Sequence, residues 1–199
     1  MDDKEIEAAV AEAIADPKRL GELLQHLRSK DDNIRFTSFT IVFAVSQRHL
    51  TILYPHWDFF VNLLTDTNNY RQFIAIRILA QLTKVDTENK FEEIFEKYYG
   101  ILEGEKTMTA AHLVGNSGII AQAKPLLEPA ITGKLLSIDT LHKGKQKELI
   151  KGYALVAFSD YFQDASNKPA ILAFARKLIK STSPKTAKKA KEFLQQWDA

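Results

Sequence analysis

The chain has 199 residues, of which 45% are hydrophobic and 26% are charged, a composition typical of globular rather than disordered proteins. It contains no cysteine, which excludes disulfides, thiolate metal ligands and cysteine nucleophiles. The net charge is +2, but residues 1–100 carry 12 Lys/Arg against 16 Asp/Glu, whereas residues 101–199 carry 15 against 9.

The predicted elements are all helices. Only 8 glycines and 6 prolines are present, and no segment alternates apolar and polar residues at a period of two, so we expect no sheet. Prolines that follow a polar residue indicate helix starts, and Asp16, Asn167 and Ser183 are predicted N-caps. About eleven helices are predicted in chain order, over residues 3–15, 17–29, 32–48, 55–65, 68–84, 88–103, 107–122, 125–137, 144–163, 168–181 and 184–197.

The first predicted helix lies in an acidic, amphipathic segment, MDDKEIEAAVAEAIAD, which is unlike a secretory signal or a transit peptide. No apolar run approaches the ~20 residues that a membrane-spanning helix needs. We therefore expect a soluble, cytoplasmic protein that does not enter a membrane.

A helix pattern recurs along the chain. Asp32 to Arg48 reads DNIRFTSFTIVFAVSQR, and Asn68 to Lys84 reads NNYRQFIAIRILAQLTK. Small residues recur at intervals of 36, 38 and 36 positions, at Ala44, Ala80, Gly118 and Ala154. A small residue lets two helix axes approach closely. Apolar residues at fixed offsets from it are expected to fill the core between repeats, among them Ile34, Tyr70 and Met108, ten positions earlier.

The recurrence predicts stacked helix pairs, because one pair cannot bury both of its faces alone. The expected fold is therefore an all-α solenoid that forms a single domain over residues 1–199. It would comprise an N-terminal helix pair at 1–30, four helix-pair repeats at 31–182 and a one-sided capping helix at 183–199.

The pattern resembles HEAT repeats and the related armadillo superfamily. It is carried by DDNIRFTSFTIVFAV, NNYRQFIAIRILAQL and KTMTAAHLVGNSGIIAQAKP, with coverage of residues 31–182. The resemblance implies a curved, right-handed α-α superhelix whose second helices line the concave face. In that family, Asp and Arg at repeated positions often form a ladder. Arg35, Arg71 and Lys145 match the basic position, and Thr109 interrupts it.

Motifs for catalysis are absent from the sequence. It has no Gly-rich phosphate loop, no GxSxG serine motif and no histidine spacing typical of zinc sites, so we expect no catalytic residue, metal ion or cofactor. LVGNSG, which includes Gly115 and Gly118, is interpreted as a closely packed helix, and Glu92, Glu93 and Glu96 as a solvated face. The aromatic stretch YPHWDFFVNLL, Tyr54 to Leu64, is interpreted as packing between repeats that leaves some surface for a partner.

Three functions are open. The leading hypothesis is a non-catalytic module or scaffold that binds a protein partner on its repeat surface. The alternative is nucleic-acid binding through a basic patch near the C-terminus, formed by Arg176, Lys177, Lys180, Lys185, Lys188, Lys189 and Lys191. The third is a divergent enzyme that resembles the alkylpurine DNA glycosylases. No catalytic residue of that family can be assigned to a position of this chain.

Overall fold

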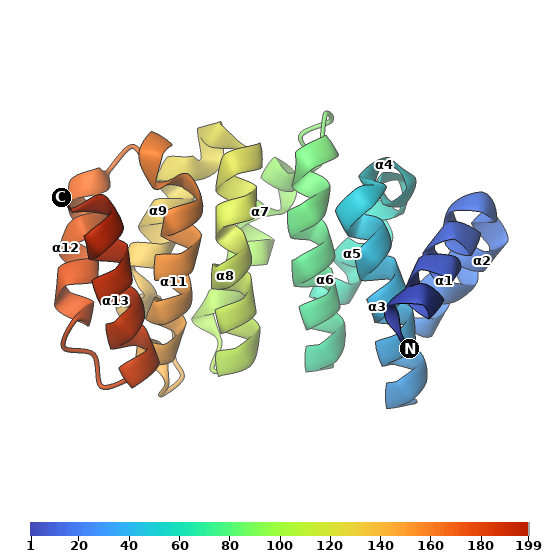
Figure 1. The fold of residues 1–199 in the computed structure, drawn as a ribbon, viewed down its shortest axis with the longest axis horizontal. Coiled ribbons are helices and arrows are strands. Elements are labelled where there is room, and N and C mark those ends of the chain that lie inside the picture. The colour runs from blue at the N-terminus through green and yellow to red at the C-terminus, as the bar shows by residue number, and fades with distance from the viewer. Residues whose placement is uncertain (199) are drawn as a thin grey trace. The chain divides into compact units, whose positions relative to one another are not determined.

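The computed structural model describes residues 1–198, and within them every regular element is a helix and no strand occurs (Figure 1). The predicted all-α class is therefore confirmed. The chain divides into two compact units, the first of which comprises Met1–Glu88 and the second of which begins at Asn89.

The first unit contains the N-terminal helices and the first two copies of the recurring pattern. Its α-helices are α1 (Asp3–Ala15), α2 (Pro17–His26), α3 (Asp32–Arg48), α4 (Leu50–Leu53), α5 (Trp57–Leu64) and α6 (Asn69–Leu82), with 3-10 turns η1 (Tyr54–His56) and η2 (Thr83–Val85). The helix α3 packs against α1, α2 and α6, and α5 packs against α6. The centre of this unit is apolar, with Val42, Val45 and Phe60 fully buried.

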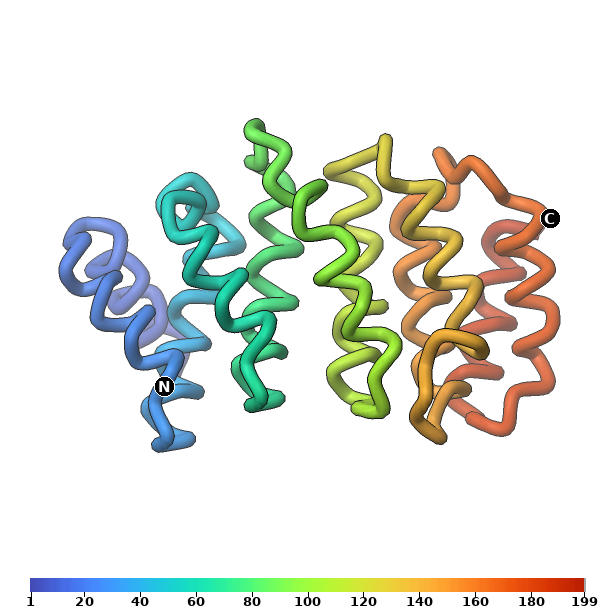
Figure 2. The backbone as a smooth tube through the Cα atoms, turned by 180° about the vertical axis from the view of Figure 1, so that it is seen from behind, coloured from blue at the N-terminus to red at the C-terminus, as the bar shows by residue number. Residues whose placement is uncertain are grey.

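The second unit contains the remaining helices. They are α7 (Lys90–Gly100), α8 (Thr107–Ala123), α9 (Glu128–Leu136), α10 (Ile138–Leu141), α11 (Lys147–Tyr161), α12 (Lys168–Leu178) and α13 (Pro184–Trp197), with 3-10 turns η3 (Ile101–Glu103), η4 (Pro125–Leu127) and η5 (Phe162–Asp164). In both views α8, α11 and α13 lie side by side in one layer, and α7, α9 and α12 form the second layer (Figures 1 and 2).

Local chemistry accounts for the helix starts. The side chain of Asp16 accepts a hydrogen bond from the backbone N–H of Lys18 and caps α2, where Pro17 occupies the first turn. Asn167 and Ser183 cap α12 and α13 in the same way. The three predicted N-caps are therefore confirmed, and each satisfies a backbone donor that the helix itself leaves unpaired.

The recurring small residues are mostly buried, as expected. Ala80 and Ala154 are fully buried, Gly118 is buried, and Ala44 is half-buried. Three of the accompanying apolar positions contradict the expectation, because Ile34, Tyr70 and Met108 are 44%, 63% and 55% exposed. These residues lie in the first turn of α3, α6 and α8, where much of each side chain is in solvent. They belong to the surface and not to the core between repeats.

Inside each unit neighbouring helices pack side by side. Two expectations depend on how the two units join, and both stay predictions. They are the continuous right-handed superhelix and the single domain over residues 1–199.

Candidate functional site

Two helices of the first unit carry matching stripes of large side chains. Residues spaced at i, i+3 and i+7 lie on one face of an α-helix. On α3 these are Phe36, Phe39 and Phe43, and on α6 they are Tyr70, Phe73 and Arg77. Because α3 and α6 pack side by side, the two stripes face a shared space.

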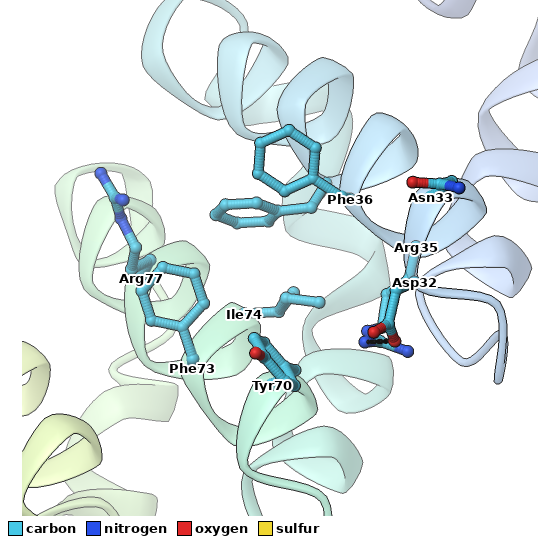
Figure 3. A pocket seen from close by; sticks show the side chains of 9 residues that line it. Asp32, Asn33, Arg35, Phe36, Tyr70, Phe73, Ile74 and Arg77 are labelled. Carbon is cyan, nitrogen blue, oxygen red and sulfur yellow. Dashed lines mark hydrogen bonds and ion pairs between the residues drawn. The ribbon is translucent and has the colours of Figure 1, made fainter.

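That space is a groove of about 460 Å³ between α3 and α6, which we call the aromatic groove (Figure 3). The stripe residues that line it are Phe36, Phe39, Tyr70, Phe73 and Arg77, and Phe43 is not among them. The rest of the lining is Asp32, Asn33, Arg35 and Ile74. Phe36 lies on one wall and Tyr70 on the other (Figure 3), and they are 69% and 63% exposed. Large apolar rings thus remain in contact with solvent inside a concave site.

The interior of the aromatic groove is a packed set of rings. The ring centroid of Phe39 lies 5.6 Å from that of Phe43 in a stacked arrangement and 5.3 Å from that of Phe73 in an edge-on arrangement. These separations are within the range favoured by aromatic pairs. The rings therefore form a preorganised wall that needs no rearrangement to accept an apolar group.

One end of the aromatic groove carries a positive charge held against the rings. The guanidinium carbon of Arg77 lies 4.0 Å from the ring centroid of Phe43, 5.5 Å from that of Phe73 and 5.9 Å from that of Phe39. Burial lowers the pKa of Arg77 from its ordinary value. Cation–π attraction offsets part of this loss of hydration.

At the other end of the groove the positive charge of Arg35 is balanced by the carboxylate of Asp32. Asp31 caps α3 by accepting a hydrogen bond of 2.8 Å from the backbone N–H of Asn33, which fixes the first turn of the helix. In that turn Arg35 is buried; it pairs with Asp32 and donates a hydrogen bond of 2.9 Å to the carbonyl oxygen of Ser29. Its guanidinium carbon lies 5.0 Å from the ring centroid of Tyr70. Arg35 is thus held by α3 and by Ser29, and it packs against the ring of Tyr70.

Arg35 of α3 and Arg71 of α6, which share the repeated basic position, each pair with a carboxylate and donate to a backbone carbonyl oxygen. Arg71 pairs with Asp66 at 2.9 Å and donates a second hydrogen bond to the carbonyl oxygen of Arg28 at the end of α2. The backbone N–H of Asn68, which donates a hydrogen bond to this carboxylate, and the contact with Arg71 lower the pKa of Asp66. In the second unit Thr109 is buried and Lys145 is exposed, so this position does not have one role throughout the chain.

The basic residues predicted near the C-terminus lie on α12, α13 and the connection between them, but they do not form a uniform patch. Arg176 makes a two-pronged ion pair with Asp198, with nitrogen–oxygen distances of 2.9 and 2.5 Å. Lys189 lies 4.7 Å from the ring centroid of Tyr153, and burial lowers its pKa. Lys188 lies 3.7 Å from Glu192.

The other four predicted basic residues, Lys177, Lys180, Lys185 and Lys191, are exposed. Lys177 and Lys180 border a hollow of about 250 Å³ that also contains Asp139, Glu148 and Lys151. Lys151 pairs with both of these carboxylates. The hollow therefore mixes both signs of charge and lacks the one-sided positive lining of an anion site.

The aromatic stretch Tyr54 to Leu64 is mainly a packing element, as expected. Trp57 and Phe60 are buried, and Phe59 lies beneath the guanidinium of Arg28 at 4.7 Å. The hydroxyl of Tyr54 donates a hydrogen bond of 2.7 Å to Asp86. Burial and this carboxylate raise the pKa of Tyr54 to about 12.

Histidines and glutamates are dispersed. Among residues 1–198 no group of three or more His, Asp or Glu side chains has the arrangement of a metal site. His142 is buried with Nδ1 at 3.0 Å from the carbonyl oxygen of Leu102, and His112 lies half-buried in α8. Glu92 and Glu96 pair with Lys124 and Lys134, at 3.2 and 2.8 Å.

Sequence reasoning directed attention to Tyr54–Leu64 and to the C-terminal lysines, and it missed the aromatic groove. The available signal was the i, i+3, i+7 stripe on α3, repeated 34 residues later on α6. Both helices also carry apolar residues on their other faces, and these masked the stripe.

In the part of the chain that the structure describes, no helix is both long enough and apolar enough to cross a membrane. No protein-family model, curated protein or solved structure matches the chain.

Proposed function

We propose that this protein is a non-catalytic protein-binding module of HEAT-repeat-like architecture, which holds a segment of a partner protein in the aromatic groove. The observation that carries the proposal is that Phe36 and Tyr70, on opposite walls of one groove, are 69% and 63% exposed. Single exposed apolar residues are ordinary on protein surfaces, but a cluster of rings in a concave site is typical of binding surfaces.

The size of the groove supports a short segment as the bound group. Its volume of about 460 Å³ lies in the range of about 300–1,000 Å³ that is typical of small binding sites. A space of this size accepts a few side chains of an extended or helical peptide. The surrounding helix surface would then add modest contacts along the rest of the partner.

The energetics also favour binding through the rings. Full burial of a phenylalanine side chain stabilises a complex by about 1.5–3 kcal/mol. Aromatic side chains in well-packed sites supply much of the free energy of protein–protein binding. Because Phe39 and Phe73 already pack together, little conformational entropy is lost when a partner docks.

The proposal is tested by selecting random-sequence peptides displayed on phage against the full chain and measuring the Kd of the selected peptides by fluorescence anisotropy. Phe36→Ser removes an exposed ring without opening the core. It is expected to weaken binding by about ten- to a hundredfold, the equivalent of about 1.5–3 kcal/mol.

The matched control is Leu126→Ser. Leu126 is 95% exposed in the second unit, outside the groove, so the same loss of apolar surface is expected to leave the Kd unchanged. Failure to select any peptide, or equal affinity for the chain and the Phe36→Ser variant, would contradict the proposal.

A further inference from the structure

We propose that the partner segment carries a carboxylate that pairs with Arg77 beside an apolar side chain that packs on the rings. The inference rests on the proposed function of the aromatic groove and specifies its ligand as an acidic–apolar peptide.

The charges that line the groove lead to this assignment. Three of the lining residues are charged, namely Asp32, Arg35 and Arg77. Asp32 and Arg35 pair with each other at one end. Arg77 forms no ion pair with any residue among 1–198, so the lining carries one uncompensated positive charge. A carboxylate is the complementary group of smallest size.

The setting of Arg77 makes such a pairing favourable. The guanidinium carbon lies 4.0 Å from the ring centroid of Phe43, so this ring replaces part of the water around the charge. Its N–H groups donate no hydrogen bond to a described residue, and the side chain is only half-buried, so the planar fork is available to a ligand. Arginine binds carboxylates through two parallel hydrogen bonds, which are stronger where water is partly excluded.

The surroundings favour a peptide carboxylate over a nucleic-acid phosphate chain. The first unit holds 10 Lys/Arg against 13 Asp/Glu over residues 1–88, a net charge of −3. Phe43 also borders the neighbouring hollow between α1 and α3, which contains Asp3 and the ion pair of Glu7 with Arg48. These charges repel a polyanion, whereas one carboxylate flanked by apolar side chains meets Arg77 and the rings together.

The experiment uses the peptides selected on the full chain. We expect Asp or Glu to be enriched at one position next to an aromatic or aliphatic residue. Arg77→Gln is expected to weaken binding of the best peptide by about ten- to a hundredfold, and Arg77→Lys by less, because the ammonium keeps the charge without the planar fork. Lys18→Gln removes the same charge from exposed α2 and is expected to leave the Kd unchanged.

A double-mutant cycle then locates the carboxylate. Replacing the acidic residue of the peptide by its amide leaves the protein unaltered, so no folding defect can cause the loss. On the Arg77→Gln variant the same peptide change is expected to have little further effect, since the two changes remove one interaction. Additive losses would overturn the inference.

The outcomes separate the two proposals. Selected peptides that need Phe36 but contain no enriched acidic position would overturn the carboxylate inference and leave the groove as a peptide site. A fluorescent single-stranded oligonucleotide that binds in a Phe36-dependent manner would overturn both. Self-association of the chain that Phe36→Ser abolishes would show that the occupant is a second copy, which also contradicts the inference.

Discussion

At the residue scale, the packing of α8 against α11 depends on the absence of a side chain at Gly118. A Cβ atom at this position would lie 2.2 Å from Oδ2 and 2.8 Å from Cβ of Asp160. Asp160 is exposed on the surface, yet partial loss of hydration beside α8 raises the pKa of its carboxyl. The sequence predicts a small residue here, because Gly118 is aligned with three alanines, but it does not identify the side chain that fills the space.

Gly118→Ala is expected to destabilise the protein. Alanine favours a helix by about 1 kcal/mol over glycine, but overlap with the Cβ of Asp160 forces a backbone or side-chain shift that costs about 1–3 kcal/mol. Gly133→Ala in α9 is the matched control, since no atom lies within 4 Å of the added Cβ, and it is expected to stabilise by about 0.5–1 kcal/mol. Urea unfolding measures both. A Gly118→Ala variant as stable as Gly133→Ala would contradict the packing described.

Residue identity alone could not place the groove side chains. Tyr70 matches Ile34 and Met108 in the recurring pattern, and the sequence predicts that all three fill the core. In the structure all three lie in the first turn of their helices and stay largely exposed. Hydrophobicity indicates which residues gain from burial, but not which side lacks a covering helix.

At the element scale, sequence chemistry predicted the long helices well. Each of the predicted helices corresponds to an observed one, because apolar spacing spans the interiors. Capping side chains or prolines mark many of the starts, but not those of α7, α8 and α11. The short helices α4 and α10 were missed. Each has only four residues, too few to show a helical period, and neither has a side-chain cap, at His49 or at Ser137.

The start of α6 offers a test of this account. The side chain of Asn68 accepts hydrogen bonds from the backbone N–H groups of Tyr70 and Arg71, at 2.9 and 3.4 Å. Asn68→Ala removes both and is expected to lower the free energy of unfolding by about 1 kcal/mol. Asn68→Asp keeps an acceptor and is expected to change it little.

Thermal and urea unfolding followed by circular dichroism provide the measurement for both Asn68 variants. Equal losses in the alanine and aspartate variants would show that the cap does not determine where α6 begins. Because α6 carries Tyr70 in its first turn, the alanine variant is also expected to weaken peptide binding slightly.

At the scale of the whole molecule, the uneven charge keeps the nucleic-acid alternative testable. Lys185, Lys188 and Lys191 are exposed on α13. If the alternative holds, a mobility-shift assay with a single-stranded oligonucleotide shows binding at low salt. Each phosphate contact contributes about 0.7 to the slope of log K against log salt, so replacing these three lysines by glutamine reduces that slope by about 2. Our proposal expects no shift at low salt and no effect of the triple change.

The all-α class was predictable because it follows from local periodicity and capping. The aromatic groove was not, because it arises where α3 and α6 meet, and the register between two helices 34 residues apart depends on packing that no short motif encodes. The lysines were conspicuous as a run of charge, yet Arg176 is neutralised by Asp198, a contact between two different helix ends.

The exposed pair Phe36 and Tyr70 has a consequence for handling and for cellular supply. Exposed rings on two facing helices offer apolar surface that other molecules can contact weakly when no partner occupies the groove. If the proposed function holds, a partner segment in the groove would also shield these two rings from such non-specific contacts.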